Sequence, residues 1–223
     1  MSRVRQLSGG GRAVEVDAHR LAGWFDRFVD GHGGASTTHV ESRRVRVRAC
    51  DGAVALVHVA FEPLPTTGDE HPGLAVSTLV EHACRARRIG VVLVRLGAHS
   101  VGISAGGKVV ESSTDRHPVH GRNKAGGWSQ QRFARRRADQ ARRSLQAAAD
   151  AVAHVVLPEQ DTLDGLVLGG DRKALATLGE DSRLSALLAS AESRVLDVPE
   201  PRRAVLDEAA RRAIAVEVQV HDP

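Results

Sequence analysis

The chain has 223 residues, of which 42% are apolar and 26% are charged, and this is enough to bury a core in one or two domains. Its 31 basic residues are 28 arginines and 3 lysines, against 27 acidic residues. Two distant cysteines, Cys50 and Cys84, exclude a disulfide scaffold and a cysteine metal knuckle. With no tyrosine and only six phenylalanines and tryptophans together, a protein that stacks single-stranded bases on aromatic rows is disfavoured.

The sequence carries no recognisable targeting or membrane-spanning segment. It has no run of 18 apolar residues, and the basic residues near its start are not followed by an apolar stretch. We therefore expect a cytoplasmic protein with no membrane partner. The arginine guanidinium binds phosphate in a bidentate manner, so clustered arginines favour RNA as the partner.

Residues 1–88 predict a small α+β region whose role the sequence does not reveal. Apolar side chains at helical spacing predict a helix over 17–30, which holds most of the aromatic residues. A hairpin follows, in which residues 44–48 alternate arginine with valine before the Asp51-Gly52 turn, so its first strand has one wet, basic face. A second helix is expected over about 75–88, and we place the domain boundary near Ile89.

Residues 89–223 predict a second, larger domain of mixed structure. A buried strand over 89–96 begins a meander, and a long helix runs from Ser129 to about Val155 after an exposed loop. The last third alternates strands and helices, which predicts an α/β layer and so an α/β (α+β) fold. The further elements expected are strands at 100–104, 108–112, 163–168, 194–196 and 214–220, and helices at 172–178, 183–191 and 201–212.

Basic residues concentrate at the start of the long helix and in the loop before it. Eight of them face a single acid, Asp139, whereas ordinary solvated helix faces mix both signs. So dense a row of like charges on a helix is tolerated best when a polyanion lies against it. The eight residues are Arg122, Lys124, Arg132, Arg135, Arg136, Arg137, Arg142 and Arg143.

The segment Gly126-Gly127-Trp128-Ser129-Gln130-Gln131 lies directly ahead of this basic helix. Paired glycines permit close approaches that a Cβ would forbid, and a helix N-terminus offers exposed amide donors. By itself such a pair is weak evidence, because most paired glycines only end one element and begin another.

The glycine pair becomes informative together with the basic run after it. Gly126-Gly127 followed by Arg132-Phe133-Ala134-Arg135-Arg136-Arg137 resembles the catalytic loop and helix of eukaryotic and archaeal class I release factors, where Gly-Gly-Gln precedes a nearly identical run. The segment Gly165-Leu166-Val167-Leu168-Gly169-Gly170 resembles the next strand of that catalytic domain. Here Gly-Gly is followed by Trp-Ser-Gln-Gln, which is similar to the VLRF group of release-factor-like peptidyl-tRNA hydrolases of ribosome quality control, in a bacterial, actinobacterial-type form.

This resemblance implies a fold like the release-factor catalytic domain, a mixed sheet with flanking helices and one long basic helix after the Gly-Gly loop. It also implies an enzyme that cleaves the ester between nascent peptide and tRNA on stalled large ribosomal subunits. Its partners would be peptidyl-tRNA, the large subunit and its rRNA, and it would need no cofactor. No codon-reading module is recognisable, so stop-codon recognition is not expected. We expect a monomer, because the loop must enter a confined channel.

A glutamine amide is not a useful base, so the resemblance assigns Gln130 the placement of a water molecule rather than proton abstraction. Amides of the Gly126-Gly127 loop would help to hold the oxyanion. Ungapped alignment from the Arg-Phe-Ala-Arg run puts Trp128 where release factors have glutamine. Gln130 is therefore the predicted catalytic glutamine, and Gln131 is the alternative.

Two other functions are compatible with the sequence. A metal-dependent tRNA nuclease would need carboxylates such as Glu111, Asp115, Asp139 and Asp164 to gather around Mg²⁺, and their scattered placement argues against it. A non-catalytic tRNA- or ribosome-binding factor would keep the basic helix without chemistry. His117 and His120 lack a second pair of zinc ligands nearby, so we predict no metal site there.

Overall fold

The computed structural model describes residues 3–66, 68–116 and 128–223, with only the course of the backbone for 128–134. Its contacts divide the chain into two compact units. The first unit comprises Met1–Ala86 together with Ile214–Pro223, and the second comprises Arg87–Ala213. The sequence had assigned residues 214–220 to the second region, whereas the strand they form lies in the sheet of the first.

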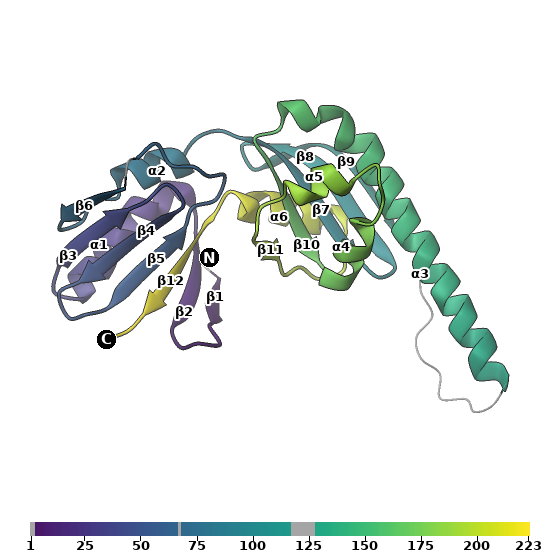
Figure 1. Cartoon of the computed structure of the whole chain (residues 1–223), viewed down its shortest axis with the longest axis horizontal. Coiled ribbons are helices and arrows are strands. Elements are labelled where there is room, and N and C mark those ends of the chain that lie inside the picture. The colour runs from purple at the N-terminus through teal and green to yellow at the C-terminus, as the bar shows by residue number, and fades with distance from the viewer. Residues whose placement is uncertain (1–2, 67, 117–127) are drawn as a thin grey trace. The chain divides into compact units, whose positions relative to one another are not determined.

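The first unit is built on a seven-stranded antiparallel sheet (Figure 1). Its strand order is β1-β2-β12-β5-β4-β3-β6. The predicted hairpin is present, since Val45 pairs with Val57 and Val47 with Ala55. The strands are β1 (Val4–Gln6), β2 (Arg12–Val16), β3 (Ala35–Val40), β4 (Arg44–Ala49), β5 (Val54–His58), β6 (Asp69–Pro72) and β12 (Val216–His221).

Two helices, α1 (Leu21–Gly31) and α2 (Ser77–Ala83), cover one face of this sheet (Figure 1). Leu21, Phe25 and Phe28 of α1 pack in one core with the inward valines of β4, β5 and β12. Alternation along β4 explains this, because its valines point to the helices and its arginines to the other face. The helix α2 is shorter than the predicted 75–88, and a short 3-10 turn (Ala18–Arg20) precedes α1.

The second unit is built on a five-stranded mixed sheet of order β11-β10-β7-β8-β9, as the fold class predicted. The central strand β7 pairs antiparallel with β8 and parallel with β10. The strands are β7 (Arg88–Arg95), β8 (Ala98–Ala105), β9 (Lys108–Arg116), β10 (Gly165–Gly170) and β11 (Val195–Leu196).

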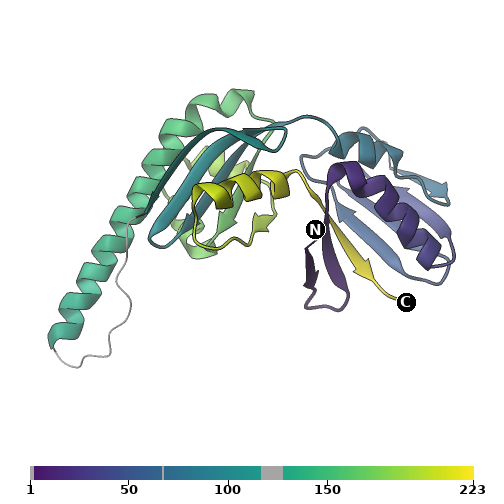
Figure 2. The same cartoon turned by 180° about the vertical axis from the view of Figure 1, so that it is seen from behind.

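Helices cover both faces of the five-stranded sheet. On one face α3 (Trp128–Val155), α4 (Arg172–Leu178) and α5 (Ser185–Ala189) pack in one core with alternate residues of β7, β8 and β10. On the other face lies α6 (Arg203–Ala213), seen in front in Figure 2. It fits closely there, because a Cβ at Gly102 of β8 would lie 3.0 Å from Leu206 of α6. A short 3-10 helix (Leu157–Thr162) joins α3 to β10.

Candidate functional site

The long helix α3 has two parts with different surroundings. The helix contacts β8, β9 and α4, and its described side chains that are buried all lie from residue 144 onward. Small side chains allow this close approach, since Ala148, Ala151, Val152 and Val155 are all buried. Before residue 144 the helix continues beyond the sheet (Figure 1), and no described side chain from 135 to 143 is buried.

Ser144 marks the point where α3 leaves the sheet. Its side chain is buried, and its hydroxyl oxygen accepts a hydrogen bond from the backbone N–H of Gly97 at 3.2 Å. Gly97 lies in the turn between β7 and β8 and is buried as well. A buried N–H without a partner is costly, so this bond fixes the helix to the turn.

A second link holds the packed part of α3 at its outer side. The Arg183 guanidinium, just ahead of α5, lies 2.9 Å from Asp150 of α3 and 2.7 Å from Asp181. Hydrogen bonds from the Arg183 side chain and backbone lower the pKa of Asp181 below its ordinary value of 3.8. The same carboxylates, Asp181 before Asp150, raise the pKa of Arg183. The packed part of α3 is therefore bonded to the rest of the second unit at two places, through Ser144 and through Asp150.

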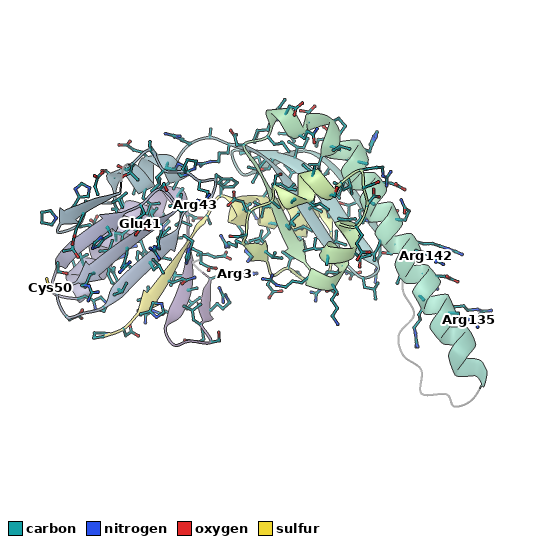
Figure 3. All side chains as sticks on the ribbon, viewed as in Figure 1. Arg3, Glu41, Arg43, Cys50, Arg135 and Arg142 are labelled. Carbon is teal, nitrogen blue, oxygen red and sulfur yellow. The ribbon has the colours of Figure 1, made fainter. Side chains whose placement is uncertain are left out.

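We call residues 128–143 of α3 the basic arm. Arg135, Arg136, Arg142 and Arg143 are exposed along it, and Arg137 is half-buried. In Figure 3 the labelled side chains of Arg135 and Arg142 project from the helix away from the sheet. Arg142 forms an ion pair with Asp139, and within the described part of the chain the other four of these arginines have none.

The electrostatics of the arm fit an anionic partner. Asp139 is one helical turn from Arg135, Arg136, Arg142 and Arg143, so a single carboxylate serves two pairs of cations. Arg132 lies three and four residues before Arg135 and Arg136, and like charges at this spacing destabilise a helix slightly. No described side chain of the arm is buried, so apolar packing does not offset that cost there. A phosphate backbone placed against the arm removes the repulsion.

The predicted catalytic residues fall at the beginning of this arm or just outside the described structure. Gln130 and Gln131 are the third and fourth residues of α3, and Arg132 follows them. The side chains of these three residues lie outside the described part of the chain. Gly126, Gly127, Arg122 and Lys124 are likewise outside the described residues, so their predicted roles stay predictions.

The carboxylates that a metal nuclease would use do not come together in the described part of the chain. Asp164 accepts a hydrogen bond from the Arg88 backbone N–H at 2.7 Å at the start of β7. Asp139 pairs with Arg142 in the arm, and Glu111 and Asp115 lie on β9. Among the described residues no group of three His, Cys, Asp or Glu side chains is placed to hold a metal ion.

The glycines of the second motif have a structural role in the strand β10. A Cβ on Gly169 would lie 2.7 Å from Leu93, and Gly170 has φ +106, where a Cβ would lie 2.2 Å from the Val94 carbonyl oxygen. The chain then turns into α4, whose N-cap Asp171 accepts a hydrogen bond from the Lys173 backbone N–H. The motif thus lets β10 pack closely beside β7.

Sequence reasoning missed Ser144, Arg183 and Asp150 as residues that position the arm. Ser144 interrupts a row of small helix residues, and Asp150 is an acid on a mostly basic helix. Neither feature indicates a partner, because Gly97 and Arg183 are far away along the chain.

In the described part of the chain, no helix combines the length and hydropathy that crossing a bilayer requires.

Comparison with solved structures returns archaeal proteins at low sequence identity. The archaeal termination factor aRF1 matches 89% of this chain and 70% of its own length at 11% identity, with a TM-score of 0.43. Pelota from Archaeoglobus fulgidus matches 95% of this chain and 65% of its own length at 14% identity, with a TM-score of 0.31. A structure described only as an archaeal protein matches 87% and 69% at 12% identity, with a TM-score of 0.39.

Comparison with family models gives a match that covers the whole second unit, its arm included, and part of β12. No curated protein matches the chain. The family model described as "Actinobacteria/chloroflexi VLRF1 release factor" matches residues 87–219, which is more than half of the chain. The chain therefore belongs to the Actinobacteria/chloroflexi VLRF1 release factor family.

Proposed function

We propose that this release-factor-family protein is a peptidyl-tRNA hydrolase that frees nascent chains from tRNA on stalled large ribosomal subunits. The observation that carries the proposal is the basic arm, a helix segment with no buried side chain among those described. It starts directly after the Gly126-Gly127 pair and has Gln130 and Gln131 in its first turns. Membership of a release-factor family supports the proposed reaction class. The protein acts in the cytoplasm, as a monomer, on ribosomal complexes.

The proposed reaction is hydrolysis of an ester. Water attacks the carbonyl carbon that joins the peptide to the tRNA ribose, and the products are a free peptide carboxyl group and a tRNA with a free ribose hydroxyl. The Gln130 amide holds the attacking water, since an amide positions a water by hydrogen bonds but does not take its proton. Backbone amides of the loop stabilise the oxyanion, and the ribose relays the proton to the leaving oxygen.

The arginines of the arm hold this chemistry in place on RNA. Arg132, Arg135, Arg136 and Arg137 contact phosphates with Arg122 and Lys124 of the loop, so binding is strongly salt-dependent. The attachments at Ser144 and Arg183 fix the direction in which the arm leaves the sheet. The enzyme thus inserts the tip of the basic arm into the large subunit, and the surrounding rRNA completes the catalytic site.

The test is release of labelled peptide from peptidyl-tRNA on stalled large subunits. We compare wild type with Gln130→Ala and Gln131→Ala, and follow the tRNA on a gel. Gln146→Ala is the matched control, because Gln146 is exposed on the same helix, beyond the arm. The proposal expects one arm variant to lose at least about a hundredfold in release rate with unchanged subunit binding, and the control to remain active.

Other results assign the alternative functions. Tight binding without release by the wild type contradicts hydrolysis and leaves a binding factor. Shortened tRNA whose appearance is suppressed by a chelator contradicts it in favour of a metal-dependent nuclease. If the double variant Gln130→Ala with Gln131→Ala releases peptide at the wild-type rate, neither glutamine has the proposed role.

A further inference from the structure

The seven-stranded sheet of the first unit has one face that α1 and α2 do not cover, which we call the open face. It carries the outward residues of β4, namely Arg44, Arg46 and Arg48. Alternate residues on a strand are roughly 6.6–6.8 Å apart, a spacing comparable to that of successive phosphates along a nucleic-acid strand. The family model begins at residue 87 and leaves strands β1 to β6 outside its match.

The strand register shows which side chains surround these arginines. Arg46 lies between His39 of β3 and Leu56 of β5, and Arg48 lies between Thr37 and Val54. Strand partners directly opposite each other are close enough to interact. Neither arginine therefore has a carboxylate opposite it on the neighbouring strands.

Arg44, Arg5 and His39 of the open face each have a carboxylate partner. Arg44 pairs with Glu41 at 2.9 Å, and Arg5 pairs with Glu217 at 3.2 Å. His39 lies 3.1 Å from Glu70. Within residues 3–66, 68–116 and 128–223, Arg46 and Arg48 form no ion pair, so the middle of the open face keeps two unneutralised guanidinium groups.

The side-chain chemistry of the open face indicates which kind of partner would bind there. Guanidinium groups bind phosphate through paired N–H donors. The open-face positions of β3, β4, β5 and β12 carry no Phe, Tyr or Trp, and their rings are the imidazoles of His39, His58 and His221. They therefore offer no row of large aromatic rings on which successive bases could stack. Proteins recognise double-helical RNA through its shape and its phosphates rather than through its bases.

We propose that the open face binds the phosphate backbone of double-helical RNA through Arg46 and Arg48. The first unit is then a second RNA-binding element of the chain, separate from the basic arm. The proposal does not rest on hydrolysis, because binding is measured on RNA that carries no peptide.

The test measures affinity for a fluorescent RNA hairpin against salt concentration. The starting protein is the full chain with Arg135→Gln and Arg136→Gln, which weakens the arm. Into it we introduce Arg46→Gln and Arg48→Gln, and in parallel Arg20→Gln and Arg27→Gln. The second pair removes the same charge from exposed positions at the start of and along α1, and thermal unfolding confirms that every variant is folded.

The proposal expects the Arg46/Arg48 variant to bind the hairpin at least about tenfold more weakly at low salt. The slope of log affinity against log salt should fall in magnitude by about two, one for each lost phosphate contact. The Arg20/Arg27 variant should match the starting protein. Arg46→Lys with Arg48→Lys keeps both charges and should restore the slope. Full-length tRNA and an rRNA-derived hairpin, compared side by side, distinguish the two natural sources of such a helix.

Several results overturn the proposal. Equal losses in both pairs mean that only net charge matters, and no loss in the Arg46/Arg48 variant means that the open face does not bind RNA. Single-stranded RNA of equal length bound as tightly as the hairpin contradicts a double-helical partner. A change in sedimentation that shows self-association through Arg46 and Arg48, with RNA affinity unchanged, assigns the face to a second copy of the chain.

Discussion

Ser144 is the residue at which the packed and projecting parts of α3 meet. Ser144→Ala removes the acceptor of the Gly97 N–H and leaves that buried donor unsatisfied. We expect the free energy of unfolding to fall by about 1–3 kcal/mol, measured by urea denaturation. The exposed Ser193 gives a control, since Ser193→Ala should change it by less than about 0.5 kcal/mol. Equal stabilities of the two variants would mean that Ser144 does not hold the helix.

Asp181 gives a prediction about pH. Its pKa is lowered by hydrogen bonds from Arg183, so its ionised form stabilises the fold above the ordinary value of 3.8. That contribution is lost as pH falls through the lowered folded-state pKa. Asp181→Asn should therefore melt below wild type at pH 7, and the gap should narrow below about pH 4. Thermal unfolding between about pH 3 and 7 checks this.

The matched change for that experiment is Asp161→Asn. Asp161 is exposed and makes no ion pair within the part of the chain that the structure describes. Its variant should follow the wild-type curve of melting temperature against pH. If the gap between Asp181→Asn and wild type stays constant across that pH range, the Arg183 contact does not depend on the carboxylate charge.

At the scale of the element, we expect the charges of the basic arm to serve binding and not folding. Arg135→Gln with Arg136→Gln should lower affinity for large subunits and reduce the magnitude of the salt slope by about two. Stability should stay the same or rise by about 0.2–0.5 kcal/mol per relieved like-charge pair. Sedimentation with subunits over a salt series measures the first, and thermal unfolding measures the second.

The control removes the same charge from another helix of the second unit. Arg172 and Lys173 are exposed in the first turn of α4. Arg172→Gln with Lys173→Gln should leave subunit binding near wild type. Equal losses in the two variants would assign binding to net charge and remove the special role of the arm.

Elements whose signals are local were predictable from the sequence, and elements defined by distant partners were not. The helix over 172–178 was predicted correctly, because Asp171 caps it and Leu175 and Leu178 give it an apolar side. The strands β1, β2, β3 and β6 were not predicted. Their short segments form strands only because each pairs in the sheet.

The residues of the candidate site also fall into those that local sequence predicts and those that it does not. The basic residues of the arm and their exposure were predictable from composition and periodicity, since one helix with many arginines and few apolar residues cannot be buried. The residues that anchor its root were not predictable. Ser144 meets Gly97, and Asp150 meets Arg183, only after the sheet and helices are assembled.

At the scale of the whole molecule, the second unit is inserted between α2 and β12 of the first. The strand β12 pairs with β2 on one side and β5 on the other, and it contributes Val216, Val218 and Val220 to the core. A chain ended at Ala213 should therefore lose the fold of residues 1–86 and keep that of 87–213.

Limited proteolysis checks this by comparing the shortened and complete chains. Residues 87–213 should persist as a fragment in both, while residues 1–86 should be degraded only in the shortened chain. Protection of residues 1–86 in the shortened chain would mean that the sheet closes without β12. A synthetic β12 peptide added to the shortened chain should slow the degradation, since the missing strand has an open position between β2 and β5.

The position of β12 also sets an order of events during synthesis. Every other strand and helix of both units precedes it along the chain. While translation proceeds, β2 and β5 emerge early yet have no partner between them until residues 216–221 are made. The five-stranded sheet, whose strands all lie within residues 88–196, can close before that. The second unit can therefore complete its fold before the first unit does, against the usual N-to-C order of domain folding.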